Sequence, residues 1–339
     1  PWYRSAIESH EVQITAPYLF DQLGMPGRTV SKRIPGTDTV IAMDMTLATI
    51  ADFLRQSKIS EHGDVFLFDA DGRIIASDEE LRIGRETLPV PELALSSQET
   101  EFIASQPVLR VSNELDWPPI DYTQSGTPSG YSIDVVRLIG KMTGLQFSFV
   151  NGHSWEELVQ LFRQGEIDLL QPVFMTAENR QLGLEGESFM PLPHAVATHS
   201  AHAALTDLSQ LGSASLAIPE GWSIIPIIRE HLPEIEIIEA ASTHDALKMV
   251  LTGTASAALD SEAVMRYVAE TSFLQGLAYH SEVNIGEGTL PDRLHIVVHK
   301  DRADLRRILD KAIAAIGPEQ RAYLDARWLT YGDEGETLA

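Results

Sequence analysis

One carboxylate follows an apolar stretch that has the character of a buried strand. Asp260 comes directly after residues 255–259, and a carboxylate in that position is costly unless a cation or an amide donor meets it. The pattern therefore indicates a binding position. The alternative is that Asp260 is the N-cap of a helix over 261–269, a role that suits aspartate.

A second candidate precedes a segment of helical periodicity at 224–231. Backbone N–H groups at a helix N-terminus, together with the Ser223 hydroxyl, are able to receive an anion. A plain helix cap explains Gly221 and Ser223 equally well. Trp222 lies between them, and as the wall of a cleft it would narrow the range of ligands.

Other chemistry is excluded or disfavoured by what is missing. The chain has no cysteine, which excludes disulfides, thiol nucleophiles and cysteine metal sites. The segment 69–72 begins like a calcium loop but lacks the remaining ligands, and His199 and His202 have no partner cluster for a metal. No phosphate loop, serine elbow or kinase signature occurs. We expect no catalytic residue, no metal and no cofactor.

Length and composition set the broad class of protein. With 339 residues, 44% hydrophobic and 22% charged, the chain is a globular protein of two or three domains. A net charge of −24 argues against nucleic-acid binding and is also explained by solubility alone. No run of 18 apolar residues is present to span a bilayer, and no signal peptide is visible. We expect that targeting and anchoring segments lie outside the given residues.

From residue 107 onward, strand-like and helix-like segments alternate, which predicts α/β layers. Strands are predicted over 108–111, 146–150, 167–170, 215–218, 235–238, 255–259 and 294–299. Helices are predicted over 133–142, 155–164, 224–231, 244–251 and 303–316. Two similar halves, 105–195 and 205–283, predict two lobes with a cleft between them.

The residues before 83 have a different pattern of strands and turns. Strands are predicted over 29–34, 39–43, 64–68 and 73–77, and a helix over 47–54. The Asp71-Gly72 pair favours a tight hairpin turn between the last two strands. The acidic segment 83–103, with Pro89 and Pro91, is predicted to be a linker.

Four segments, taken in order, resemble the family 3 extracellular solute-binding proteins. They are Leu109–Val135 with Trp117-Pro-Pro and Gly126-Thr-Pro-Ser-Gly-Tyr, Ser154–Asp168, Thr176–Arg180, and Pro219–Asp260 with Gly221-Trp-Ser. The resemblance covers nearly all of 105–331. It implies an α/β, two-lobed, type II periplasmic-binding-protein-like fold, the Venus flytrap of amino-acid importers and of some sensor kinases.

The resemblance also implies a ligand held between the lobes. Arg180 would clamp a ligand carboxylate, Asp260 would receive an amino group, and Trp117 would stack on the ligand. Tyr122, Trp222 and Ser223 complete the expected ligand-binding residues. A surface role for Arg180 and a core role for Trp117 are the alternatives. The sequence departs from the family pattern at Asn179, an extra residue before the arginine, and in Ser188–His194.

The first region resembles part of a double Cache sensor domain, a PAS-like fold. The matching segments are Pro1-Trp-Tyr, Ala16-Pro-Tyr, Ala42–Met45 and Gly63–Ala76. Amino-acid-binding Cache domains use the Trp-Tyr pair and an aspartate for the ligand, which implies Trp2, Tyr3 and Asp44 here.

These observations lead to one expected organisation. Residues 1–82 form the partial Cache-like segment, 83–103 the linker, 104–331 the flytrap (lobe 1 over 104–196 and 288–331, lobe 2 over 200–284), and 332–339 a tail towards a membrane segment. Hinges are predicted near 195–200 and 284–290.

The expected function is ligand sensing in the periplasm by a bacterial membrane receptor that is not itself an enzyme. Its partner is an amino acid or a small carboxylate, with no nucleic acid, membrane attachment through segments outside the chain, and a homodimer as one assembly. The alternatives are the solute-binding component of an amino-acid importer and a periplasmic dehydratase-like enzyme.

Overall fold

The computed structural model describes most of the chain after residue 89 and parts of the chain before it. The described residues are 2–7, 9, 11–15, 18–20, 25–34, 36–46, 66–68, 74–77, 90–124, 126–202, 205–281, 284–285 and 288–329. The chain divides into two units, residues 1–87 with 271–273, and residues 88–270 with 274–339.

The first unit contains an antiparallel sheet built around one long strand. β3 (Met25–Arg33) pairs with β1 (Gln13–Ile14), β2 (Tyr18–Phe20) and β4 (Val40–Thr46), and α1 (Trp2–Ile7) contacts β3 and β4. β5 (Phe66–Phe68) and β6 (Ile74–Ser77) form an antiparallel pair. The strand pairs predicted here are confirmed, whereas the predicted helix over 47–54 lies outside the described residues.

The segment expected to be a linker contains a helix. α3 spans Ser97–Ala104, and Ser96 and Glu99 form its capping box, in which each side chain satisfies a backbone N–H of the first turn. Lys311 donates to the Glu99 carboxylate at 2.8 Å and so attaches α3 to α9 (Ala303–Ala315). Residues 97–103 of the predicted linker are thus helical, which the acidic composition did not indicate.

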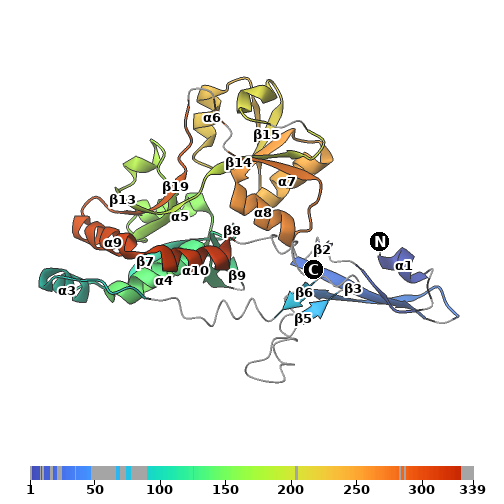
Figure 1. Ribbon diagram of the computed structural model, residues 1–339, viewed down its shortest axis with the longest axis horizontal. Helices are drawn as coiled ribbons and strands as arrows, with labels where there is room; N and C mark the ends of the chain where they lie inside the picture. The colour runs from blue at the N-terminus through green and yellow to red at the C-terminus, as the bar shows by residue number, and fades with distance from the viewer. Residues whose placement is uncertain are drawn as a thin grey trace. The chain divides into compact units, whose positions relative to one another are not determined.

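Lobe 1 of the second unit is a five-stranded sheet with helices on its faces (Figure 1). Its strand order is β11 (Phe147–His153), β7 (Leu109–Glu114), β12 (Leu169–Phe174), β19 (Arg293–Val298) and β13 (Leu184–Pro191). The first three strands are parallel, and β19 is antiparallel to both of its neighbours. The helices are α4 (Tyr131–Thr143), α5 (Trp155–Arg163), α9 and α10 (Pro318–Trp328).

Lobe 2 repeats this pattern. Its strand order is β16 (Glu236–Ala240), β15 (Ser215–Pro219), β17 (Ala257–Ser261), β14 (His194–His199) and β18 (Leu277–Ser281). Again three strands are parallel and the fourth, β14, is antiparallel to both neighbours. The helices are α6 (Ile225–His231), α7 (Thr243–Thr252) and α8 (Glu262–Thr271). The predicted two-lobed α/β fold is confirmed.

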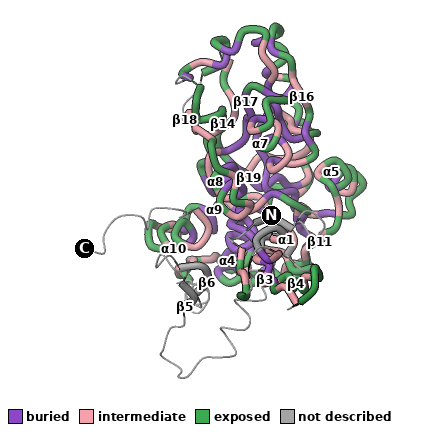
Figure 2. The backbone as a smooth tube through the Cα atoms, turned by 90° about the vertical axis from the view of Figure 1, so that its right-hand side faces the viewer, coloured by how far each residue is buried: buried purple, intermediate pink, exposed green. Residues whose placement is uncertain are grey.

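The cores of the lobes follow from apolar stripes on amphipathic helices. On α4 and α9, buried residues recur at helical spacing, for example Ile139 with Met142 and Leu305 with Ile308, so one face of each helix packs inward. The central strands β12 and β17 are buried along their whole length, and Figure 2 shows this for β17. Strands in this position are mainly apolar in sequence because both faces of the sheet are covered.

The lobes are connected by two crossover segments that lie side by side. The first is residues 192–193 between β13 and β14, and the second includes residues 289–292 before β19. The Leu192 N–H donates to the Asp292 carbonyl at 2.7 Å. The first crossover is thus shorter and lies earlier than the hinge predicted near 195–200, because β14 begins at His194. In the second, Gly288 packs against His231 of lobe 2, and Gly286 lies outside the described residues.

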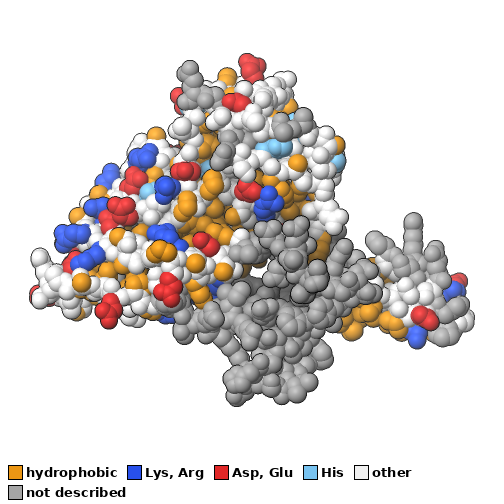
Figure 3. Space-filling view, in the orientation of Figure 1, with side chains coloured by type: hydrophobic (Ala, Val, Ile, Leu, Met, Phe, Trp, Pro, Cys, Tyr) orange, Lys and Arg blue, Asp and Glu red, His pale blue; other side chains and the backbone are white. Residues whose placement is uncertain are grey.

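The surface of lobe 1 carries interleaved charges. Figure 3 shows basic and acidic side chains alternating over the part of this lobe that contains α9. Arg306 pairs with Asp310 at 2.7 Å and Arg307 with Asp304 at 2.8 Å. Within the described ranges, no helix is long and apolar enough to cross a membrane.

Candidate interlobe binding site

Four aromatic rings meet where the lobes face each other. Trp117 of β8 (Asp116–Trp117) and Phe174, at the end of β12, come from lobe 1. Trp222, before α6, and His194, at the start of β14, come from lobe 2. Trp117 and Trp222 are in edge contact with ring centroids 5.6 Å apart, and His194 lies 4.8 Å from Phe174. We call these four residues the aromatic cluster.

Asp260 lies beside this cluster, at the end of β17. The side chain is buried and accepts hydrogen bonds from the Thr243 hydroxyl and the Ser261 backbone N–H. Burial raises the pKa of Asp260 to about 7, and these donors, with the nearby indole N–H of Trp117, oppose that rise. Asp260 belongs to a strand and bonds the next residue, so it is not the N-cap of α8.

Two further acids of lobe 1 face lobe 2. Burial, followed by the charges of Asp116 and Asp260, raises the pKa of Glu114 to about 8. Burial also raises the pKa of Asp116, while the nearby His244 of α7 lowers it. The negative charges of Asp116 and Asp260 disfavour ionisation of Glu114. A ligand cation placed among them would relieve that repulsion.

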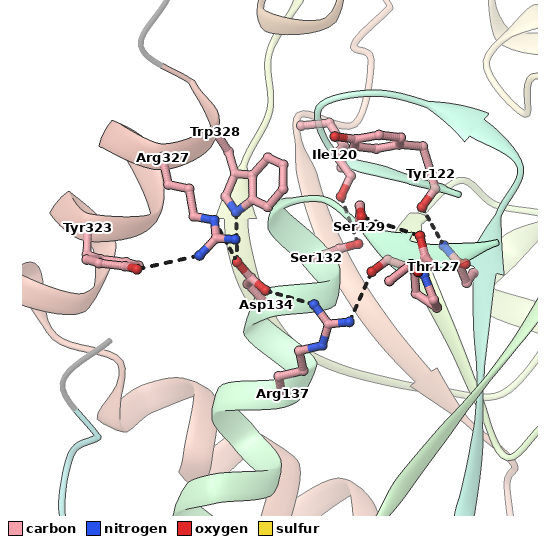
Figure 4. Close-up of polar contacts among 12 residues, drawn as sticks. Ile120, Tyr122, Thr127, Ser129, Ser132, Asp134, Arg137, Tyr323, Arg327 and Trp328 are labelled. Atoms are coloured by element: carbon pink, nitrogen blue, oxygen red, sulfur yellow. Dashed lines mark hydrogen bonds and ion pairs between the residues drawn. The ribbon is translucent and has the colours of Figure 1, made fainter. Parts of the chain in front are cut away.

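Tyr122 lies at another part of the lobe boundary. It belongs to β9 (Asp121–Gln124) and meets Trp328 of α10 edge to face, with ring centroids 6.3 Å apart (Figure 4). Burial raises its pKa, and the Tyr267 hydroxyl of lobe 2 adds to the rise. Asp134 fixes Trp328 by accepting a hydrogen bond from its indole Nε1 at 3.0 Å.

Arg180 forms an exposed ion pair within lobe 1. Its Nε pairs with Glu185 at 3.3 Å, and its side chain is 58% exposed. The preceding Asn179 is buried and donates through its side-chain amide to the Phe174 carbonyl at 2.8 Å. The extra residue in this segment therefore fills the buried position, and the arginine turns outward.

Ser223 is half-buried in the loop before α6 and does not cap it. The N-cap residue is Ile224, and no side-chain hydrogen bond caps this helix. The plain helix cap, which was the alternative for Ser223, is therefore wrong, and an anion site at Ser223 stays a prediction. Trp222 lies in the aromatic cluster, and its role as the wall of a ligand cleft stays a prediction.

The expected Cache residues lie in the first unit. Trp2 and Tyr3 are adjacent on α1, with ring centroids 5.9 Å apart. Asp44, on β4, accepts a hydrogen bond from the Thr29 hydroxyl at 2.6 Å. A Cache ligand site formed by these residues stays a prediction.

Several residues of the interlobe region were absent from the predicted set. Glu114, Asp116, Phe174, His194 and Ser261 all lie at strand ends near the boundary between the lobes. Glu114 and Asp116 carried a signal, since they immediately precede the Trp117-Pro-Pro motif. Ser261 follows Asp260 directly, but its polarity alone gave no reason to select it.

Other polar groupings do not form a metal site. Among the described residues, no group of three or more histidine and acidic side chains has the arrangement needed to hold a metal ion. A separate hollow of about 510 Å³ on lobe 2 is lined in part by His199, His202 and Gly253. It contains none of the residues predicted to bind ligand.

Comparison with known proteins agrees with this architecture. Residues 109–331 match the family described as bacterial extracellular solute-binding proteins, family 3. The chain therefore belongs to this family.

Among curated relatives, the virulence sensor protein BvgS of Bordetella bronchiseptica is 23% identical over 244 residues, which is 72% of this chain. The chain spans 19% of the length of that relative.

Solved structures show the same fold. The periplasmic VFT2 domain of Bordetella pertussis BvgS superposes with a TM-score of 0.61 at 22% identity, covering 70% of this chain and all of that one. A Salmonella typhimurium periplasmic binding protein with high arginine specificity gives a TM-score of 0.56 at 17% identity, covering 66% of this chain and 100% of that one.

Proposed function

We propose that this chain is the periplasmic ligand-sensing region of a bacterial transmembrane receptor. It binds a small solute between its lobes and signals through their closure, without catalysing a reaction. The proposal rests chiefly on the convergence of Trp117, Trp222 and Asp260 from opposite lobes. The similarity to a sensor protein over most of the chain supports a receptor rather than an importer component.

The proposed ligand is an amino acid that presents its amino group to the interlobe acids. Asp260 with Glu114 offers carboxyl groups whose desolvation a cation would offset. Trp117 and Trp222 offer ring faces, which attract cations and pack on apolar groups. Tyr122 and Ser223 remain proposed contributors, and Arg180 would have to leave Glu185 in order to bind a ligand carboxylate.

Closure is explained by differential binding. A ligand that contacts both lobes favours the closed form only by the ratio of its affinities for the two forms, and a thousandfold ratio corresponds to about 4 kcal/mol. The adjacent crossovers at 192–193 and 289–292 are the proposed hinge.

A thermal-shift screen of the 20 amino acids and of small carboxylates against the full chain tests this proposal. We expect at least one amino acid to raise Tm, and Asp260→Asn to weaken its Kd at least tenfold. Asp304→Asn, a change on the outer helix α9, is the control and should leave Kd unchanged.

Small-angle scattering with the responding amino acid tests closure, and we expect a smaller radius of gyration. If no compound in the screen shifted Tm, the solute-binding proposal would be wrong. If a compound bound without compaction, the closure mechanism would be wrong.

A further inference from the structure

His194 and Ser261 occupy neighbouring positions on adjacent strands of lobe 2. They are register partners in the antiparallel pair β14 and β17, so their side chains project from the same face of the sheet. Phe174 and Trp222 lie against the His194 ring, with centroids 4.8 Å and 6.0 Å away. Two polar side chains are thus enclosed by aromatic walls at the lobe boundary.

The polar atoms at this position have no partners within the described part of the chain. Both ring nitrogens of His194 and the Ser261 Oγ are buried and make no hydrogen bond, whereas the Trp117 indole N–H acts on the Asp260 carboxyl group. Ser261 is fully buried and Trp117 is only 7% exposed. Buried polar groups are nearly always hydrogen-bonded, so two neighbouring side chains with unmet capacity point to a group that is supplied from outside.

The hydrogen-bonding capacity of these atoms indicates which kind of ligand group would satisfy them. Burial lowers the pKa of His194 to about 4, so near neutral pH the ring is uncharged and offers one donor and one acceptor. The Ser261 hydroxyl also donates and accepts, while the Trp117 indole only donates. The Asp260 carboxyl group, which accepts from the Ser261 backbone N–H, lies beside them and would repel a second carboxylate.

We infer that His194 and Ser261, with the Trp117 indole, form a subsite for an uncharged hydrogen-bonding group of the ligand, a carboxamide or a hydroxyl. The subsite discriminates against a carboxylate in the same place. This inference rests on the proposed function, because it specifies part of the ligand that the interlobe site binds.

Titration calorimetry of the full chain with glutamine and with glutamate tests the inference, since the two differ at one terminal group. We expect glutamine to bind at least tenfold more tightly. Ser261→Ala and, separately, His194→Phe should reduce this ratio below threefold. Both variants should keep a Tm at least as high as the wild type, because replacing an unpaired buried polar group with an apolar one removes its desolvation cost.

Ser112→Ala is the matched control. Ser112 is also fully buried, but its hydroxyl bonds both the Gln171 carbonyl at 2.6 Å and the Gln171 N–H at 2.7 Å. We expect this variant to lower Tm and to keep the glutamine preference. Ser261→Ala is the safer of the two subsite variants, since it adds no volume.

Three results would overturn the subsite and leave the proposed function standing. They are equal or tighter binding of glutamate by the wild type, a Tm loss in Ser261→Ala as large as that in Ser112→Ala, and an unchanged ratio in both subsite variants. The last result would mean that water alone satisfies these atoms. Binding of neither amino acid would overturn the inference, and the screen would then decide separately whether the proposed function survives.

Discussion

Tyr122 and Trp328 meet edge to face, with ring centroids 6.3 Å apart and ring planes at 85°. Because the Tyr267 hydroxyl of α8 also acts on Tyr122, one phenol ring lies between lobe 2 and the last described helix, α10. Tyr122 is therefore a side chain that both lobe 2 and α10 contact.

The indole nitrogen of Trp328 gives the first prediction. Trp328→Phe keeps an aromatic ring beside Tyr122 but removes the hydrogen bond from Nε1 to the Asp134 carboxylate, which is 3.0 Å long. Asp134 retains its ion pairs with Arg137 and Arg327. We expect a loss of about 1–2 kcal/mol in the free energy of unfolding, measured by urea denaturation.

The control for this change is Trp155→Phe on α5, a half-buried tryptophan of a separate core cluster. It removes the same volume of ring but leaves the hydrogen bond between Trp328 and Asp134 in place. Equal stability of Trp328→Phe and the wild type would show that the Asp134 contact contributes nothing.

The interlobe acids predict a dependence of stability on pH. Burial raises the pKa of Asp260 from 3.8 to about 7 and that of Glu114 from 4.5 to about 8. Between about pH 4 and pH 8 the folded state therefore binds more protons than the unfolded state, so the free energy of unfolding falls as pH rises.

Urea denaturation at pH 5, 6, 7 and 8 measures this slope. We expect Asp260→Asn and Glu114→Gln each to flatten it. Asp304→Asn, whose side chain is 58% exposed, should leave it unchanged. Parallel slopes for the wild type and both interlobe variants would exclude these acids as its source.

Substitution by alanine at two glycines in and next to the β9–β10 hairpin (β10 is Thr127–Ser129) should lower the free energy of unfolding by different amounts. Gly130 has φ 126°, and a Cβ there would lie 2.4 Å from the Ile120 carbonyl oxygen, whereas Gly126 has φ 78° and nothing within 4 Å of its Cβ position. Gly126→Ala should cost about 1–2 kcal/mol, the penalty of the left-handed conformation. Gly130→Ala should cost more, because the backbone must also move. Similar urea midpoints for the two variants would contradict this close approach.

A substitution of Arg180 distinguishes a surface ion pair with Glu185 from the binding of a ligand carboxylate. Its pair with Glu185 is exposed, so Arg180→Ala should change the free energy of unfolding by less than about 1 kcal/mol. If the side chain stays outward, the Kd of a responding amino acid should change less than in Asp260→Asn, as calorimetry would measure. A larger loss of affinity would mean that Arg180 exchanges Glu185 for a ligand carboxylate.

The order of helices and strands in the flytrap was accessible from the sequence, because apolar periodicity is a local signal. The helix predicted over 244–251 is Thr243–Thr252, with Ser242 as its N-cap and Gly253 as its C-cap. The helix at Ser97 was missed for a different reason. Its capping box of Ser96 and Glu99 is also a local signal, but the acidic composition of the segment is more typical of a linker.

The site was less accessible, because it depends on contacts between distant residues. His194 and Ser261 are register partners although they are 67 residues apart in the sequence (261 − 194). No local sequence pattern specifies such a pairing. The outward turn of Arg180 follows from burial of Asn179 beside Phe174. Trp117, Trp222 and Asp260 could be proposed from the sequence because each belongs to a segment that resembles the family.

The crossovers at 192–193 and 289–292 make lobe 2 a single insertion between paired strands of lobe 1. β13 leads out and β19 leads back, and these strands are hydrogen-bonded neighbours. Segments whose ends lie close together tolerate exchange well. Lobe 2 can therefore be exchanged as one unit. A chimaera that carries the second lobe of another family member should have a changed ligand preference and should retain the contact between Tyr122 and Trp328.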